Sequence, residues 1–198
     1  MTNKETVQEA LKLAGENPSI IPDTSEELIS TYQSFVPFIY YLVQLMKPKK
    51  VFEWGPGTST SVFLLADNSL EIHSYENLKE WNDLYKSKLL VRHPEYINRI
   101  HFNLRPLDSK DQKEYINPIE FFNHTLDIIL IDGKKRDLCM ISAQKMISDR
   151  GVILVHDMQN QTRFDKIKKH VLPKTRFLGH HKHPKHPEYT AIWIQDIE

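Results

Sequence analysis

Short apolar runs alternate with helical segments along this chain from residue 50 onward. The runs have the length of strands and lie at residues 51–54, 71–75, 100–104, 126–131 and 152–156. The segments between them carry the helical period and lie at residues 59–66, 78–91, 116–122 and 136–148. Strands that alternate with helices predict a mostly parallel sheet with helices on both faces.

The end of the chain departs from this alternation. A helix is expected at residues 161–171, and two strands follow at 176–181 and 189–195. The link between these strands is too short for a crossover helix, so they should pair antiparallel. The pattern therefore predicts an α/β fold whose parallel sheet ends in an antiparallel hairpin.

The segment before residue 50 is helical in pattern. Helices are expected at residues 5–14 and 25–45, and the second must stop before Pro48, because proline disfavours a helical residue in front of it. We expect residues 1–49 to form a helical extension that covers a ligand pocket or makes a dimer contact, and residues 50–198 to form the ligand-binding domain. The apolar second helix favours a homodimer.

Composition narrows the classes of partner. The chain has 198 residues, 40% hydrophobic and 26% charged, which suits one globular domain. Lys+Arg and Asp+Glu each total 26, so no global basic field favours nucleic acid as a partner. The single cysteine, Cys139, excludes an intramolecular disulfide. No apolar run is long enough to span a membrane and the N-terminus lacks a secretion signal, so we expect a cytoplasmic protein with no membrane partner.

A glycine-bearing turn follows the first predicted strand, at the edge of the sheet where such folds bind ligands. Gly55 and Gly57 allow the backbone to approach a ligand without a Cβ between them. The helix start at Thr58 and Ser59 offers free amides to an anionic group. Glu53, just before the turn, would repel a phosphate. It therefore indicates a ligand that is cationic at this end.

A second acid, Glu76, ends the next strand about 20 residues later, which is the spacing expected of a carboxylate that holds ribose hydroxyls. Asn77 follows it and is expected to cap the next helix, with Glu80 completing a capping box. Turn and acid together indicate an adenosine-type ligand. A dinucleotide would need glycine where Thr60 stands, so S-adenosylmethionine, with its ammonium and sulfonium, fits better.

Four segments of the chain resemble, in order, motifs of class I S-adenosylmethionine-dependent methyltransferases. Residues 53–60 resemble the first motif, 75–77 the second, 129–136 the fourth-strand motif of small-molecule O-methyltransferases, and 151–157 their fifth strand. The resemblance implies a Rossmann-like three-layer αβα sandwich with seven strands in the order 3-2-1-4-5-7-6. It implies methyl transfer from S-adenosylmethionine to an oxygen or nitrogen of a small molecule. It also implies that Asp108 binds the adenine.

Three residues at the ends of neighbouring central strands are candidates for the chemistry. Asp132 is expected to contact both cofactor and acceptor, and His156 or Asp157 can act as general base. Alternatively, the resemblance to metal-dependent O-methyltransferases implies that Asp132 and Asp157 hold magnesium. Here His156 stands where that pattern has an acid, and a site of Asp132, His156 and Asp157 would accept manganese or iron as well. Simpler roles also stay open: Asp132 as part of a turn and Asp157 as a helix cap. Arg136 can bind an anionic substrate group, or it can cap the start of its own helix through Asp132 or Asp137.

Other functions also stay open. The chain could use the same cofactor with a non-methylating outcome, or be a non-catalytic partner subunit that kept the pocket. An NAD-dependent oxidoreductase is disfavoured by Glu53 and Thr60. A histidine-rich segment near the end resembles a metal-binding tract but is expected to be a solvated loop; it contains His180, His181, His183 and His186.

Overall fold

The computed structural model describes residues 1–17, 35–107, 112–118, 122–182 and 189–195. Its seven-stranded sheet has the order β3-β2-β1-β4-β5-β7-β6. The strands are β1 Lys50–Trp54, β2 Glu71–Glu76, β3 Ile100–Leu104, β4 Leu126–Ile131, β5 Ile147–Val155, β6 Thr175–Lys182 and β7 Tyr189–Gln195. Strands β1 to β5 are parallel, whereas β7 is antiparallel to both β5 and β6. The predicted fold class, strand order and terminal hairpin are confirmed.

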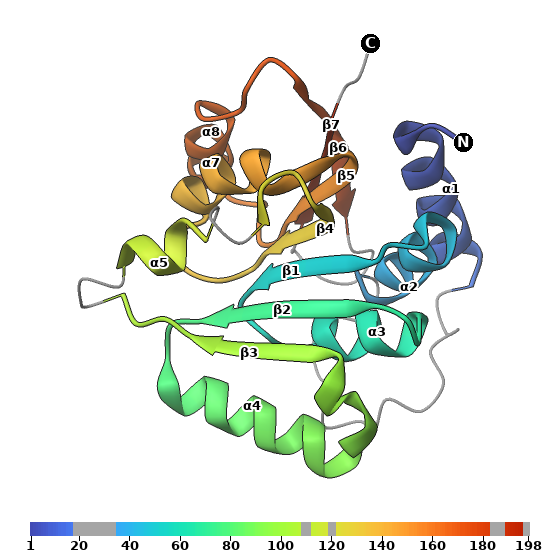
Figure 1. Cartoon of the computed structure of the whole chain (residues 1–198). Coiled ribbons are helices and arrows are strands. Elements are labelled where there is room, and N and C mark those ends of the chain that lie inside the picture. Colours follow the sequence, from blue (N-terminus) through green and yellow to red (C-terminus); the bar gives the residue numbers. More distant parts are fainter. Residues whose placement is uncertain (18–34, 108–111, 119–121, 183–188, 196–198) are drawn as a thin grey trace.

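Helices cover both faces of the sheet (Figure 1). They are α1 Asn3–Glu16, α2 Phe35–Met46, α3 Thr58–Ala66, α4 Lys79–Arg92, α5 Gln112–Ile116, α7 Arg136–Met146 and α8 Gln161–Lys168, with a 3-10 turn, η1, at Pro94–Asn98. Side chains of α1 to α4 pack on one face, and those of α5, α7 and α8 pack on the other. The result is three layers with one hydrophobic core on each side of the sheet.

The central strand β4 belongs to both cores. Ile128 and Leu130 point to the α3 side, while Ile129 and Ile131 point to the α7 side. All four are fully buried, and each contributes roughly 2 kcal/mol through the apolar area it removes from water. This alternation explains why the strand is apolar at nearly every position.

The N-terminal helices pack into the α3-side core. Val7 and Ala10 of α1 join the same cluster as Ile192 of β7. Most of α2 is buried there too, through Phe35, Val36, Pro37, Phe38, Ile39, Leu42 and Val43. These apolar side chains of α2 are therefore buried within the chain, which explains the apolar helix without a homodimer. The homodimer itself stays a prediction. The division of the chain near residue 50 stays a prediction.

In the part of the chain that the structure describes, every helix is too short or too polar to span a membrane.

The helix expected at residues 116–122 can be assessed only in part: α5 ends at Ile116, Asn117 and Pro118 are not helical, and Phe122 is helical. Asn117 precedes Pro118, and the proline ring disfavours a helical conformation there. Residues 119–121 lie outside the described part. So does the first half of the helix expected at residues 25–45, of which only α2 can be assessed.

Candidate functional site

A pocket of about 1180 Å³ opens beyond the carboxyl ends of the parallel strands. Its walls come from the segments after β1, β2, β4 and β5, and from α2, α4 and α8. The lining includes Phe35, Val36, Gly55, Gly57, Thr58, Ser59, Glu76, Asn77, Leu78, Trp81, Asp132, Gly133, Arg136, His156, Asp157, Arg163 and Lys166. Most of the residues predicted from sequence therefore face one cavity, although they are spread over 100 residues of chain.

The turn after β1 has the conformation that its glycines permit. Gly55 has φ +88°, and a Cβ there would lie 3.0 Å from the backbone nitrogen of Gly133. Gly57 is the N-cap residue of α3, and its amide donates to Thr60 Oγ1 at 3.0 Å. The indole of Trp81 also donates to the carbonyl of Pro56 at 2.7 Å, so α4 braces the turn from the pocket side.

Glu53 lies behind this turn and not in the pocket. Its side chain is fully buried, and its carboxylate accepts from Thr60 Oγ1 at 2.6 Å and from Ser59 Oγ at 3.3 Å. Burial raises the pKa of Glu53 from 4.5 to about 8, against the opposing effect of the Thr60, Ser74 and Ser59 hydroxyls. Glu53 is not among the residues that line the pocket, because alternation along β1 turns its side chain toward α3, and its contact with a ligand stays a prediction. Glu53 anchors the first turn of that helix.

Glu76 reaches the pocket as predicted. Its Oε1 accepts from the amides of Asn77 and Leu78, at 2.6 and 2.8 Å. Leu78 is the N-cap residue of α4 and makes no side-chain cap, so the predicted capping by Asn77 is wrong: the carboxylate of Glu76 binds these amides instead. Burial raises the pKa of Glu76, whereas the two amides and Lys134 lower it.

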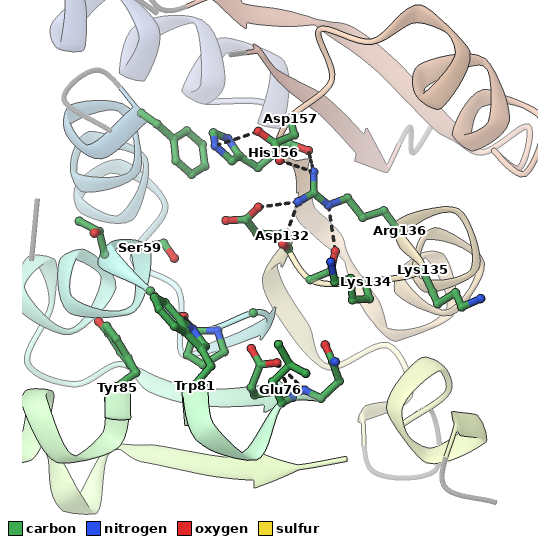
Figure 2. A pocket seen from close by; sticks show the side chains of 18 of the residues that line it. Ser59, Glu76, Trp81, Tyr85, Asp132, Lys134, Lys135, Arg136, His156 and Asp157 are labelled. Carbon is green, nitrogen blue, oxygen red and sulfur yellow. Dashed lines mark hydrogen bonds and ion pairs between the residues drawn. The ribbon is translucent and has the colours of Figure 1, made fainter. Parts of the chain in front are cut away.

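Arg136 joins the ends of β4 and β5 (Figure 2). Its Nη2 donates to Asp132 Oδ1 at 3.0 Å and its Nη1 to Asp157 Oδ2 at 3.0 Å. The same guanidinium binds the carbonyls of Asp132, Gly133 and His156, at 2.9, 3.0 and 2.6 Å. Only 13% of its side chain is exposed. The predicted contact of Arg136 with Asp132 is confirmed, and the additional contact with Asp157 ties two strand ends together.

This arrangement does not fit the metal site considered from the sequence. The space between the carboxylates of Asp132 and Asp157 is spanned by the guanidinium of Arg136, and Arg163 brings a second positive charge to 3.7 Å from Asp157 Oδ2. His156 Nε2 lies 3.8 Å from Asp157 Oδ1. Asp132, His156 and Asp157 do not converge on a common point as ligands of a small cation must. We therefore assign no step of the reaction to a metal at this position.

His156 is held between the pocket and the core. Its ring stacks on Phe35 of α2 with centroids 5.1 Å apart, and Nδ1 lies 3.0 Å from Thr190 Oγ1. Burial lowers the pKa of His156 from 6.5 to about 4, so the ring is neutral at pH 7. Asp157 beside it has φ +58°, an uncommon backbone conformation for a residue other than glycine. A neutral imidazole facing a cavity can accept a proton.

The structure thus gathers most of the predicted site. Gly55, Gly57, Thr58, Ser59, Glu76, Asn77, Asp132, His156 and Asp157 line the pocket. Asp108 lies outside the described residues. Sequence reasoning missed the pocket-lining role of Trp81 on α4. For Trp81 the signal was an aromatic side chain in the first turn of the helix after Glu76.

A seven-stranded sheet of this order, with a pocket beyond the carboxyl ends and a glycine turn after β1, is the class I S-adenosylmethionine-dependent methyltransferase fold. The chain has this fold. Neither a family model nor a curated protein sequence matches it.

Solved structures do match. A methyltransferase from Podospora anserina, bound to SAH (S-adenosylhomocysteine), is 14% identical with a TM-score of 0.62, over 96% of this chain and 88% of that one. An O-methyltransferase from Bacillus cereus in complex with SAH is 17% identical with a TM-score of 0.63, over 96% and 91%. A putative O-methyltransferase from Klebsiella pneumoniae is 13% identical with a TM-score of 0.65, over 100% and 91%. At these identities the likeness establishes the fold.

Proposed function

We propose that this protein is a methyltransferase that moves a methyl group from S-adenosylmethionine to an oxygen or nitrogen of a small molecule. The observation that carries the proposal is the shared pocket. The glycine turn, the acid after β2 and the His156–Asp157 pair all face one cavity, large enough for donor and acceptor together.

The donor side of the pocket is formed by the turn after β1 and by the end of β2. The backbone at Gly55 and Gly57 leaves room for a close approach, and the amides at the start of α3 favour a carboxylate. Glu76 is 6% exposed, and one oxygen is fixed by two backbone amides, which orients the carboxylate toward ribose hydroxyls. S-adenosylmethionine supplies the electrophilic methyl group when it is bound. Two of the structures named above carry its demethylated product, which supports this donor.

The acceptor side is formed by α2, the end of β5 and α8. Phe35 and His156 make a flat wall, and Asp157, Arg136 and Arg163 make a polar one. Methyl transfer to a hydroxyl requires that its proton leaves. His156 is the group we infer to accept it, because the carboxylates of Asp132 and Asp157 are both engaged with Arg136. Positioning of the acceptor against the donor supplies much of the remaining acceleration.

Binding and product analysis test the proposal in two stages. Calorimetry should detect binding of S-adenosylhomocysteine but not of NAD; the reverse result would favour the oxidoreductase. The protein is then incubated with S-adenosylmethionine and panels of phenols, catechols, amines and carboxylic acids. Mass spectrometry should find an acceptor that has gained one methyl group. Cofactor binding with any other product would support a non-methylating reaction, and binding without turnover would support a partner subunit.

The same assay tests the metal. Because Arg136 spans the two carboxylates, methyl transfer should continue after treatment with EDTA and removal of the chelator. Loss of activity that magnesium or manganese restores would contradict the assignment of Arg136.

A further inference from the structure

A second group of chemically active side chains lies at the other end of the sheet. Glu71 and His73 are on β2 and His101 is on β3, and His73 and His101 are register partners in the parallel pair. Glu71 lies two residues before His73, so all three side chains project from the same face. Glu71 and Glu76, the pocket residue, are five positions apart on β2, which corresponds to about 17 Å at the usual rise of a strand. The group is therefore separate from the proposed active site.

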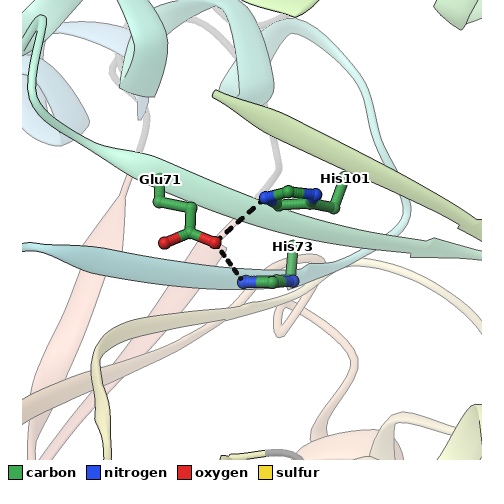
Figure 3. Close-up of side chains that lie close together, drawn as sticks. All are labelled: Glu71, His73 and His101. Atoms are coloured by element: carbon green, nitrogen blue, oxygen red, sulfur yellow. Dashed lines mark ion pairs between the residues drawn. The ribbon is translucent and has the colours of Figure 1, made fainter. Parts of the chain in front are cut away.

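The three side chains converge on one point (Figure 3). Glu71 Oε1 lies 2.9 Å from His101 Nε2 and 3.1 Å from His73 Nε2. The ligand atoms of the three residues all lie within 4.8 Å of one another. Ligands bound tetrahedrally to zinc at about 2.0–2.1 Å are roughly 3.3 Å apart, so small side-chain movements would place these atoms around an ion.

The surroundings favour a stable and accessible site. The two histidine rings stack with centroids 4.6 Å apart and 17° between their planes, and Phe122 contacts His73 edge-on at 4.6 Å. Both strands are hydrogen-bonded in the sheet, so the ligand positions are fixed by the backbone. The side chains of Glu71 and His101 are 38% and 48% exposed, which leaves an approach from solvent.

We propose that Glu71, His73 and His101 bind a divalent transition metal ion, with zinc the best match to the ligand set. Two neutral imidazoles and one carboxylate suit zinc better than magnesium or calcium, which prefer oxygen ligands. Three protein ligands leave a fourth tetrahedral position for water or a group from a partner. The ion would link β2 to the edge strand β3.

Zinc binding to the full chain tests this proposal. The protein is prepared without a polyhistidine tag, stripped with chelator and dialysed against zinc chloride. Elemental analysis should find about one zinc ion per chain, as expected for a single site. Cobalt(II) in place of zinc should give the visible absorption bands of tetrahedral coordination. His93→Gln is the matched control, since His93 is a partly exposed histidine that pairs with Glu95 at 3.3 Å, away from the cluster.

Two variants locate the ion. His101→Gln and Glu71→Gln should each abolish binding at zinc concentrations that saturate the wild type, with circular dichroism unchanged because both side chains are partly exposed. The control should bind as the wild type does. No zinc uptake by the wild-type chain would overturn the proposal, and so would full uptake by a folded His101→Gln or Glu71→Gln protein, which would place the ion elsewhere. Neither result depends on whether the protein transfers methyl groups.

Discussion

The buried carboxyl of Glu53 makes the stability of this protein depend on pH in a way that one substitution should remove. The pKa of Glu53 is raised from 4.5 to about 8, chiefly by burial. Between these values the folded chain holds a proton that the unfolded chain has released. The contribution of Glu53 to the free energy of unfolding is therefore fully present below pH 4.5 and is lost as the pH rises toward 8. The slope should be about 1.4 kcal/mol per pH unit.

Glu53→Gln keeps the shape and an oxygen that can accept from Thr60 Oγ1, but it cannot ionise. The unfolding free energy of the wild type, minus that of the variant, should fall by about 3 kcal/mol between pH 5 and pH 8. Urea unfolding followed by circular dichroism at each pH measures this difference, in which other titrating groups cancel. Glu16→Gln, on the exposed end of α1, is the control. If the wild-type and Glu53→Gln curves run parallel across this range, Glu53 is ionised in the folded protein and our account of its burial fails.

Three further predictions concern the pocket. Arg136→Met should lower the unfolding free energy by about 2–4 kcal/mol, because it leaves Asp132 without its cation and Asp157 with only the more distant Arg163. Urea unfolding measures the loss. Gly133→Ala would place a Cβ 2.1 Å from the hydroxyl of Tyr115, and it should lower the unfolding free energy by about 1–3 kcal/mol. Adding Tyr115→Phe to the same chain should recover part of this stability, because it removes that hydroxyl. If the double variant recovers none, the clash is not the cause. His156→Gln should reduce kcat by about 10²- to 10⁴-fold with unchanged binding of S-adenosylhomocysteine. Because the pKa of His156 is about 4, wild-type activity should be lost only as the pH falls through that value, and an unchanged kcat in the variant would exclude His156 as the base.

The fold was more predictable from sequence than the site. The strands β3, β4 and β7 begin and end where the apolar runs do, and the motif positions placed the pocket at the correct edge. The orientation of Glu53 was not predictable in the same way. Alternation along a strand places side chains on two faces of the sheet, but the sequence does not show which helix covers which face. The hydroxyl partners of Glu53, Ser59 and Thr60, lie on α3, so these contacts depend on how that helix packs against the sheet.

Contacts between strands were still harder to foresee. His73 and His101 are 28 positions apart, and only the register of β2 with β3 brings their rings together. Nothing in either local sequence marks the pair, because a histidine in a strand is compatible with many neighbours. The cluster with Glu71 is therefore a product of topology, and it becomes visible only when the strand order is fixed.

The link made by Arg136 explains why acidic motifs alone did not define the chemistry. Two carboxylates at the ends of adjacent parallel strands repel each other in a partly buried place, so the fold needs a cation between them. A divalent ion is one solution. Here Arg136, four residues after Asp132 and at the first position of α7, supplies a permanent charge in a planar fork that reaches both acids. A cation fixed in this way does not exchange with solvent, and it binds one oxygen of each carboxylate. Under the function we propose, the acceptor's proton goes to another group, and we infer that this group is His156, which is neutral and lines the pocket.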